Sequence, residues 1–155
     1  MRTPYFLIDE KKLVQNLEIL HGVAERAGCK ILLAQKAYSV WQTYPLIARY
    51  LAGTEASGLF EAKLGREEFG KEVHVFAPAY REEDIRQLVK IADHIVFNTP
   101  AQVRRFAPLC MEKGVSAGLR VNPECSTQEG HEIYDPCAPF SRLGTTLANF
   151  DEEIL

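Results

Sequence analysis

Residues 31–39 have the sequence ILLAQKAYS, in which an apolar run ends at a short polar segment. The run Ile31–Ala34 is too short and too uniformly apolar for an exposed helix face, so it predicts a buried strand. The turn that follows contains Gln35 and Lys36 but no glycine. A sheet that binds nucleotides should carry a glycine-rich segment at its first strand-to-helix turn. Residues 31–39 therefore favour a barrel over a doubly wound sheet.

The same alternation of strand and helix repeats along the rest of the chain. A lead-in strand is predicted over residues 6–8, followed by a helix that Asp9 caps and Gly28 ends. Strands that alternate with helices at a spacing of roughly 20 residues indicate parallel βαβ units. The predicted strands are 31–34, 55–57, 73–76, 94–97 and 116–120, and the predicted helices are 41–51, 59–69, 82–91 and 100–112.

The expected fold class is α/β, as a partial (β/α)₈ TIM barrel of about five βα units. A complete barrel typically needs about 250 residues, and the chain has 155. Its last residues, Asp151–Leu155, resemble the start of another helix. We therefore expect residues 1–155 to form the N-terminal part of a barrel domain, in which strand edges are left open.

Composition and charge narrow the class of protein. Apolar residues make up 46% and charged residues 25% of the chain, which is typical of a globular domain in water. The net charge of −3 lacks the basic excess that nucleic-acid binding needs. The apolar stretch near the N-terminus is broken at Asp9 and is too short for a signal sequence or a membrane span. We expect a cytoplasmic protein with neither nucleic acid nor membrane as partner.

The four cysteines form no close pair, so we expect reduced, unlinked thiols. Cys125, His131 and Cys137 are evenly spaced and could make a metal site that lacks a fourth ligand. Structural zinc ligands come as close pairs on tight turns, which favours a polar loop instead. No metal site is expected.

Lys36 is the strongest candidate for chemistry. Active sites of barrels lie at the carboxyl ends of the strands, and Lys36 directly follows the strand 31–34. A lysine buried there can lose its charge through desolvation, which leaves an amine able to form a Schiff base. A lysine whose ammonium extends to solvent is the alternative.

Other polar residues near strand ends carry weaker signals. Arg120 suits a phosphate or carboxylate, and a salt bridge to a neighbouring loop explains it equally well. Glu61 could pair with a cation across the barrel mouth, although a solvated glutamate in a first helical turn is the simpler account. His74 and His94 are expected to be hydrogen-bonded structural histidines.

The chain resembles the carboxynorspermidine (carboxyspermidine) decarboxylases, in the alanine racemase-like superfamily of barrel enzymes that use pyridoxal phosphate (PLP). The resemblance runs in order over nearly the whole chain. The stretch Ala34–Ala37 fits the wider superfamily, whereas Asp135–Pro139 ahead of Ser141–Gly144 is more particular to this family. The matching stretches are Thr3–Asp9, Ile31–Tyr38, Gly53–Ser57, Glu72–Phe76, Pro78–Tyr80, Asp93–Asn98, Asp135–Pro139 and Ser141–Thr145.

The resemblance implies PLP-dependent removal of CO₂ from carboxynorspermidine or carboxyspermidine in polyamine biosynthesis. Lys36 would hold the cofactor, with Ala34 and Arg120 in the same pocket. Arg142 looks like a basic residue near the subunit interface of a homodimer, and Asp135 lies in a loop that could contact substrate. The family's remaining barrel units, its C-terminal β domain and most of its substrate contacts lie beyond residue 155, so activity of these 155 residues alone is doubtful.

Three alternatives remain open. One is another barrel-type PLP decarboxylase, similar to those acting on ornithine or diaminopimelate. Another is a cofactor-free aldolase in which Lys36 forms a Schiff base with a sugar-like carbonyl. The last is a non-catalytic half-barrel that only binds PLP or needs a partner chain.

Overall fold

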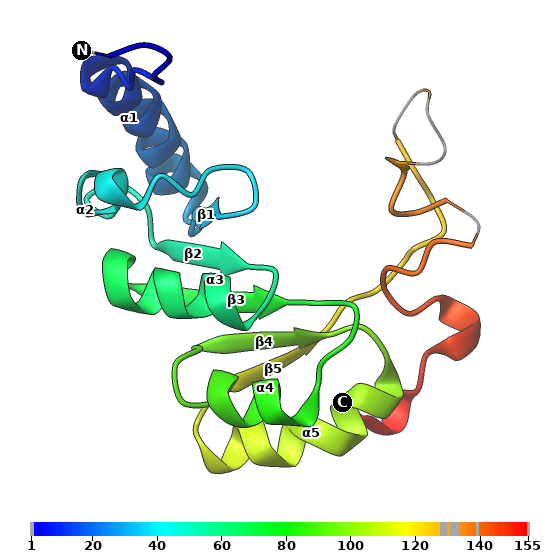
Figure 1. The fold of residues 1–155 in the computed structure, drawn as a ribbon. Coiled ribbons are helices and arrows are strands. Elements are labelled where there is room, and N and C mark those ends of the chain that lie inside the picture. The colour runs from blue at the N-terminus through cyan, green and yellow to red at the C-terminus, as the bar shows by residue number, and fades with distance from the viewer. Residues whose placement is uncertain (1, 128–129, 131–133, 139, 155) are drawn as a thin grey trace.

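The computed structural model describes residues 2–127, 130, 134–138 and 140–154. They form one sheet of five parallel strands whose spatial order follows the chain (Figure 1). The expected alternation of strands and helices is therefore confirmed. The strands are β1 (Leu32–Ala34), β2 (Gly53–Ala56), β3 (Glu72–Phe76), β4 (His94–Phe97) and β5 (Ser116–Leu119).

The first helix begins and ends at residues whose chemistry explains its limits. Asp9 precedes the first helix, and its carboxylate accepts hydrogen bonds from the backbone N–H groups of Lys11 and Lys12. Gly28 ends that helix with a positive φ of 61°, a conformation that glycine adopts without strain. The helices are α1 (Glu10–Ala27), α2 (Tyr44–Ile47), α3 (Leu59–Leu64), α4 (Glu82–Leu88) and α5 (Pro100–Glu112). A π-helix over Gly65–Phe69 extends α3, and 3₁₀ helices cover Trp41–Thr43, Leu147–Asn149 and Glu152–Ile154.

One face of the sheet is packed against the helices. Successive residues of a strand point to opposite faces, and on β3 and β4 the buried residues alternate with half-buried ones. The main core lies between β2–β5 and α3–α5, and Phe97 is fully buried there against the rings of Tyr80 and Phe106. A smaller core joins α1 and α2 to Leu33 of β1.

The other face of the sheet carries the half-buried residues. Strand pairing places Ala34, Glu55, His74 and His94 in one row on this face. In a closed barrel the face turned away from the helices becomes the interior. The polar character of this row therefore marks the face on which a site can be built.

Two sequence predictions were wrong in part. Residues 6–8 form no strand, and Phe6 and Leu7 are exposed, because no described strand lies beside them to supply backbone partners. The helix predicted over 41–51 is a 3₁₀ turn followed by the short α2, which has Pro45 in its first turn. In the described part of the chain, no helix is both long and apolar enough to cross a membrane.

Candidate functional site

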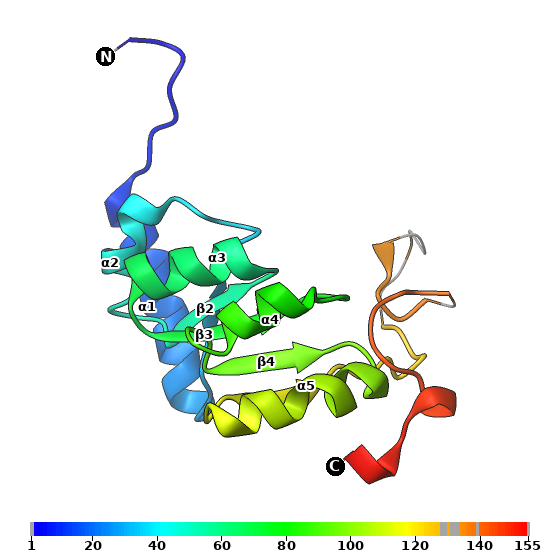
Figure 2. The ribbon, with the colours of Figure 1, turned by 60° about the horizontal axis from the view of Figure 1, so that its bottom comes forward.

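The carboxyl ends of the strands gather the residues that the sequence singled out. Lys36 follows β1, Asn98 follows β4, and Arg120 follows β5. The described parts of the segment between Arg120 and Phe150 also lie beyond this end of the sheet, as Figures 1 and 2 show from two directions. This end is therefore the candidate active site.

Hydrogen bonds fix the turn that carries Lys36. The carbonyl of Ala34 accepts hydrogen bonds from the backbone N–H groups of Ala37 (3.0 Å) and Tyr38 (3.2 Å). The side chain of Gln35 is fully buried, donates to the carbonyl of Glu61 (2.9 Å) and accepts from the hydroxyl of Tyr44 (3.1 Å). Because Gln35 is anchored to α2 and α3, the backbone position of its neighbour Lys36 is set.

The side chain of Lys36 is exposed, which matches the alternative of a lysine whose ammonium extends to solvent. β1 ends at Ala34, and Lys36 belongs to the turn that follows, as the sequence predicts. β1 is also an edge strand among the described residues, so no neighbour covers the turn from that side. Ala34 itself is half-buried.

Glu55 is the residue that connects Lys36 with Arg120. It is the direct partner of Ala34 in the register of β1 and β2, and its side chain is half-buried. Burial raises the pKa of the Glu55 carboxyl, whereas the positive charges of Lys36 and Arg120 lower it and the negative charge of Glu61 raises it further. The three residues thus form one electrostatic cluster, Lys36–Glu55–Arg120. The place of Glu55 near the end of a predicted strand already marks it as a residue of the barrel mouth, but the sequence alone assigns it no role.

Arg120 is held by contacts with Phe76 of β3, Phe97 of β4 and Thr145. Its guanidinium carbon lies 4.5 Å from the centre of the Phe76 ring. Its backbone N–H donates to the carbonyl of Phe97 (2.8 Å), and its carbonyl accepts from Thr145 (2.9 Å). A half-buried guanidinium on an aromatic face is positioned to receive an anionic group.

Glu61 has a structural role. One of its carboxylate oxygens accepts the backbone N–H of Ser57 at 2.6 Å, across the start of α3. This contact ties the end of β2 to the helix that follows it. The structure thus supports a glutamate of the first helical turn more than a cation partner across the mouth.

Asn98 holds the segment that contains Arg142. Its buried side chain donates to the carbonyl of Arg142 (2.9 Å) and accepts from the backbone N–H of Gly144 (2.6 Å). The Asn98 backbone N–H in turn donates to the side chain of Gln102 at 2.7 Å. Arg142 therefore extends an exposed side chain from a fixed backbone.

We expect Asn98→Ala to loosen residues 142–144 and to lower the free energy of unfolding by about 2 kcal/mol, because two part-buried backbone groups lose their partners. Amide hydrogen exchange should rise at Gly144 in the full-length protein. Asn149→Ala is the control, since the exposed side chain of Asn149 donates to the hydroxyl of the nearby Thr146 and makes no hydrogen bond to Gly144. Equal protection of Gly144 in both variants would contradict this role for Asn98.

The Asp135 segment forms a local turn at the same end. The carboxylate of Asp135 accepts the backbone N–H of Cys137 at 2.8 Å. An open pocket nearby is lined by residues 125–127 and 134–137. His131 lies outside the described residues, so the structure does not test the set Cys125, His131 and Cys137. All four cysteines are free thiols, as expected.

The chain is similar in sequence to several decarboxylases. No family model matches the chain. It is 41% identical to the carboxyaminopropylagmatine decarboxylase of Synechocystis sp. over 146 residues, which are 94% of this chain and 38% of that protein. Identity is also 41% over 142 residues with the carboxynorspermidine/carboxyspermidine decarboxylase of Herminiimonas arsenicoxydans, covering 92% and 38% of the two chains.

A third relative adds a solved structure. The carboxynorspermidine/carboxyspermidine decarboxylase of Campylobacter jejuni is 38% identical over 151 residues, 97% of this chain and 39% of that protein. The crystal structure of carboxynorspermidine decarboxylase from Campylobacter jejuni, complexed with norspermidine, superposes with a TM-score of 0.85 at 34% identity, covering 98% of this chain and 38% of that one. The chain is a homologue of these decarboxylases.

The match with the decarboxylases confirms the resemblance found in the sequence and the fold class of a partial TIM barrel. The chain spans about two fifths of the length of the curated relatives it matches. The Lys36–Glu55–Arg120 cluster belongs entirely to this shared part. Further contacts to a cofactor or substrate in the decarboxylases can therefore come from the larger part that the match does not reach.

Proposed function

We propose that residues 1–155 form the N-terminal part of the PLP-binding barrel domain of an enzyme that removes CO₂ from carboxynorspermidine or carboxyspermidine. The observation that carries the proposal is the Lys36–Glu55–Arg120 cluster at the carboxyl ends of the strands, in a chain homologous to decarboxylases. Catalytic groups of barrel enzymes lie at this end.

The residues present fit PLP by their chemistry. The cofactor offers an aldehyde, for which the exposed primary amine of Lys36 is the natural partner. It also carries a phosphate, for which the half-buried guanidinium of Arg120 is a suitable anion-binding group. Ala34 has a small side chain, which leaves room beside this pair.

In this proposal each residue of the cluster has one task. The amine of Lys36 would hold the cofactor through the aldehyde of PLP. When bound, PLP supplies a sink for the electrons left by departing CO₂. Glu55 balances the charges of Lys36 and Arg120 and so orients both.

The proposal extends to assembly and location. We place Arg142 at the interface of a homodimer, since its side chain is exposed while Asn98 fixes its backbone. Asp135 lies in the loop proposed to approach the substrate. The four free thiols fit the reducing cytoplasm.

The test is CO₂ release by the full-length protein, with and without PLP. Carboxynorspermidine, carboxyspermidine and carboxyaminopropylagmatine form the main panel, and ornithine and diaminopimelate represent the other decarboxylases. We expect PLP-dependent release from the first two compounds. CO₂ release from ornithine or diaminopimelate alone would show that the proposed substrate is wrong. CO₂ release from none of the compounds would refute the proposal that the protein is a decarboxylase.

Borohydride trapping separates the chemical alternatives. Reduction of the full-length protein in the presence of PLP should leave a PLP-sized mass on the peptide that contains Lys36. An adduct that forms only with a sugar carbonyl would identify an aldolase instead. No adduct under either condition would favour a chain without catalytic function.

Arg120→Ala should weaken PLP binding about 10- to 100-fold, because a hydrogen bond between charged groups contributes about 1.5–3 kcal/mol. Absorbance titration of the full-length protein with PLP measures the dissociation constant. Arg86→Ala is the matched control, since Arg86 pairs with Glu82 on the exposed side of α4. An unchanged dissociation constant in Arg120→Ala would remove Arg120 from the cofactor pocket.

A further inference from the structure

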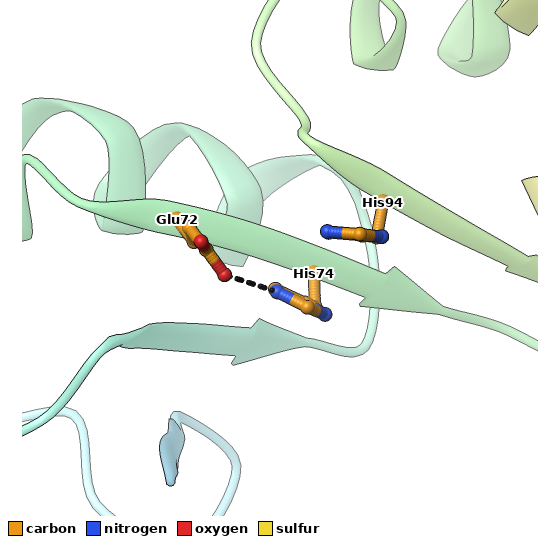
Figure 3. Close-up of side chains that lie close together, drawn as sticks. All are labelled: Glu72, His74 and His94. Atoms are coloured by element: carbon orange, nitrogen blue, oxygen red, sulfur yellow. Dashed lines mark hydrogen bonds and ion pairs between the residues drawn. The ribbon is translucent and has the colours of Figure 1, made fainter. Parts of the chain in front are cut away.

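A second polar cluster lies on the open face of the sheet, near the amino ends of the strands. Glu72 and His74 belong to β3 and are two residues apart, so their side chains share one face. His94 begins β4 and is the direct register partner of His74. Figure 3 shows Glu72 and His74 extending from β3, joined by a dashed line, and His94 extending from β4 toward β3.

The cluster brings three metal-binding groups within reach of one another. One ligand atom from each of Glu72, His74 and His94 lies within 4.8 Å of the others. The Nε2 atom of His74 is 3.1 Å from a carboxylate oxygen of Glu72. The imidazole rings of His74 and His94 are stacked, with centres 4.1 Å apart and planes 22° apart.

We propose that Glu72, His74 and His94 form a binding site for a divalent transition-metal ion of the Zn²⁺ type. Imidazole nitrogens and a carboxylate oxygen are typical zinc ligands, and three protein ligands leave a further position for water. All three residues are half-buried, so an ion can reach them and still lose most of its hydration water.

The present contacts of the cluster are compatible with an ion. The ammonium of Lys30 pairs with one carboxylate oxygen of Glu72, and the other oxygen faces His74. Lys30 is largely exposed, so it can move away when an ion neutralises the carboxylate. Zn–N distances of about 2.0–2.1 Å require the donor atoms to close in by side-chain rotation. Strand pairing fixes the three Cα positions, so this closure is left to the side chains.

Glu55 of the proposed cofactor site is the register partner of His74, but the two residues proposed to bind PLP lie farther along the sheet. The cluster occupies the start of β3 and β4, whereas Lys36 and Arg120 follow the ends of β1 and β5. Barrel chemistry is performed at the carboxyl ends of the strands. We therefore assign the ion a structural role in joining β3 to β4.

The test is titration of the metal-free full-length protein with Zn²⁺ by calorimetry, in the absence of PLP. We expect one equivalent to bind, and His74→Ala or His94→Ala to weaken binding at least about 100-fold, since even outer partners of a ligand change affinity 10- to 100-fold. His21→Ala is the matched control, because His21 lies on α1 and contacts the Tyr50 carbonyl. An equal loss of Zn²⁺ affinity in His21→Ala, or an unchanged affinity in His94→Ala, would refute the proposed site.

X-ray absorption of the Zn²⁺-loaded wild-type protein gives a second answer that needs no variant. Two imidazoles with oxygen ligands and no sulfur are the expected shell. Sulfur at about 2.3 Å would place the ion on cysteines instead. An absence of bound Zn²⁺ would refute the proposal and leave the PLP assay unaffected.

Discussion

Lys36→Ala should abolish decarboxylation by the full-length protein, with a loss of roughly a thousandfold or more, and should remove the visible absorbance of bound PLP. Removing the residue that bonds covalently to a reacting group typically costs this much or more, because the whole reaction path depends on it. Spectra recorded after addition of PLP, together with CO₂ release from carboxynorspermidine, measure both effects.

Lys36→Arg separates covalent chemistry from charge. Arginine keeps a positive charge next to Glu55 but cannot bind an aldehyde in this way, so it should be as inactive as Lys36→Ala. Lys63→Ala is the control, since Lys63 bonds to Gln87 between two helices and should retain activity. Survival of both absorbance and activity in Lys36→Ala would make the central assignment wrong.

Phe97→Ala should lower the free energy of unfolding by about 3–5 kcal/mol. Phe97 is fully buried, and its ring packs against Tyr80 at 5.7 Å and Phe106 at 6.0 Å between centres. Removing the ring loses the free energy gained by burying it away from water. It also leaves a cavity that the close-packed neighbours fill only in part. Urea unfolding of the full-length protein at fixed concentration measures the change.

Phe60→Ala is the matched control for the core. Phe60 lies on α3 but remains 79% exposed, so its removal should change the free energy of unfolding by less than about 0.5 kcal/mol. A similar loss in both variants would mean that the face of α3 carrying Phe60 is buried in the full-length protein. A negligible loss in Phe97→Ala would contradict the packing of β4 against α5.

The sequence predicted the βα units well because buried strands and capped helices have local signals. His94–Phe97 and Pro100–Glu112 were predicted with the observed bounds. Their limits are marked by apolar runs, by a capping threonine at 99 and by a proline in the first helical turn. The lead-in strand over 6–8 failed because a strand depends on a neighbour, which local sequence does not contain.

The candidate site was predictable only in part. Lys36 and Arg120 were found because both directly follow strands, but the burial of Lys36 depends on what covers the turn. Glu55 and the cluster of Glu72, His74 and His94 depend on register between strands, which periodicity within one strand does not specify. His74 and His94, which the sequence predicts only as separate structural histidines, are neighbours because β3 pairs with β4.

The agreement between strand order and chain order also bears on how the molecule folds. Leu33 pairs with Thr54, Thr54 with Val73, Val75 with Ile95, and Ile95 with Ala117, so each pairing closes a loop of roughly 20 residues. The entropic cost of each addition is therefore similar and small. As the chain leaves the ribosome, each new strand can join the one completed just before it, without waiting for distant sequence. The sheet can thus grow in one direction, from β1 to β5, while synthesis continues.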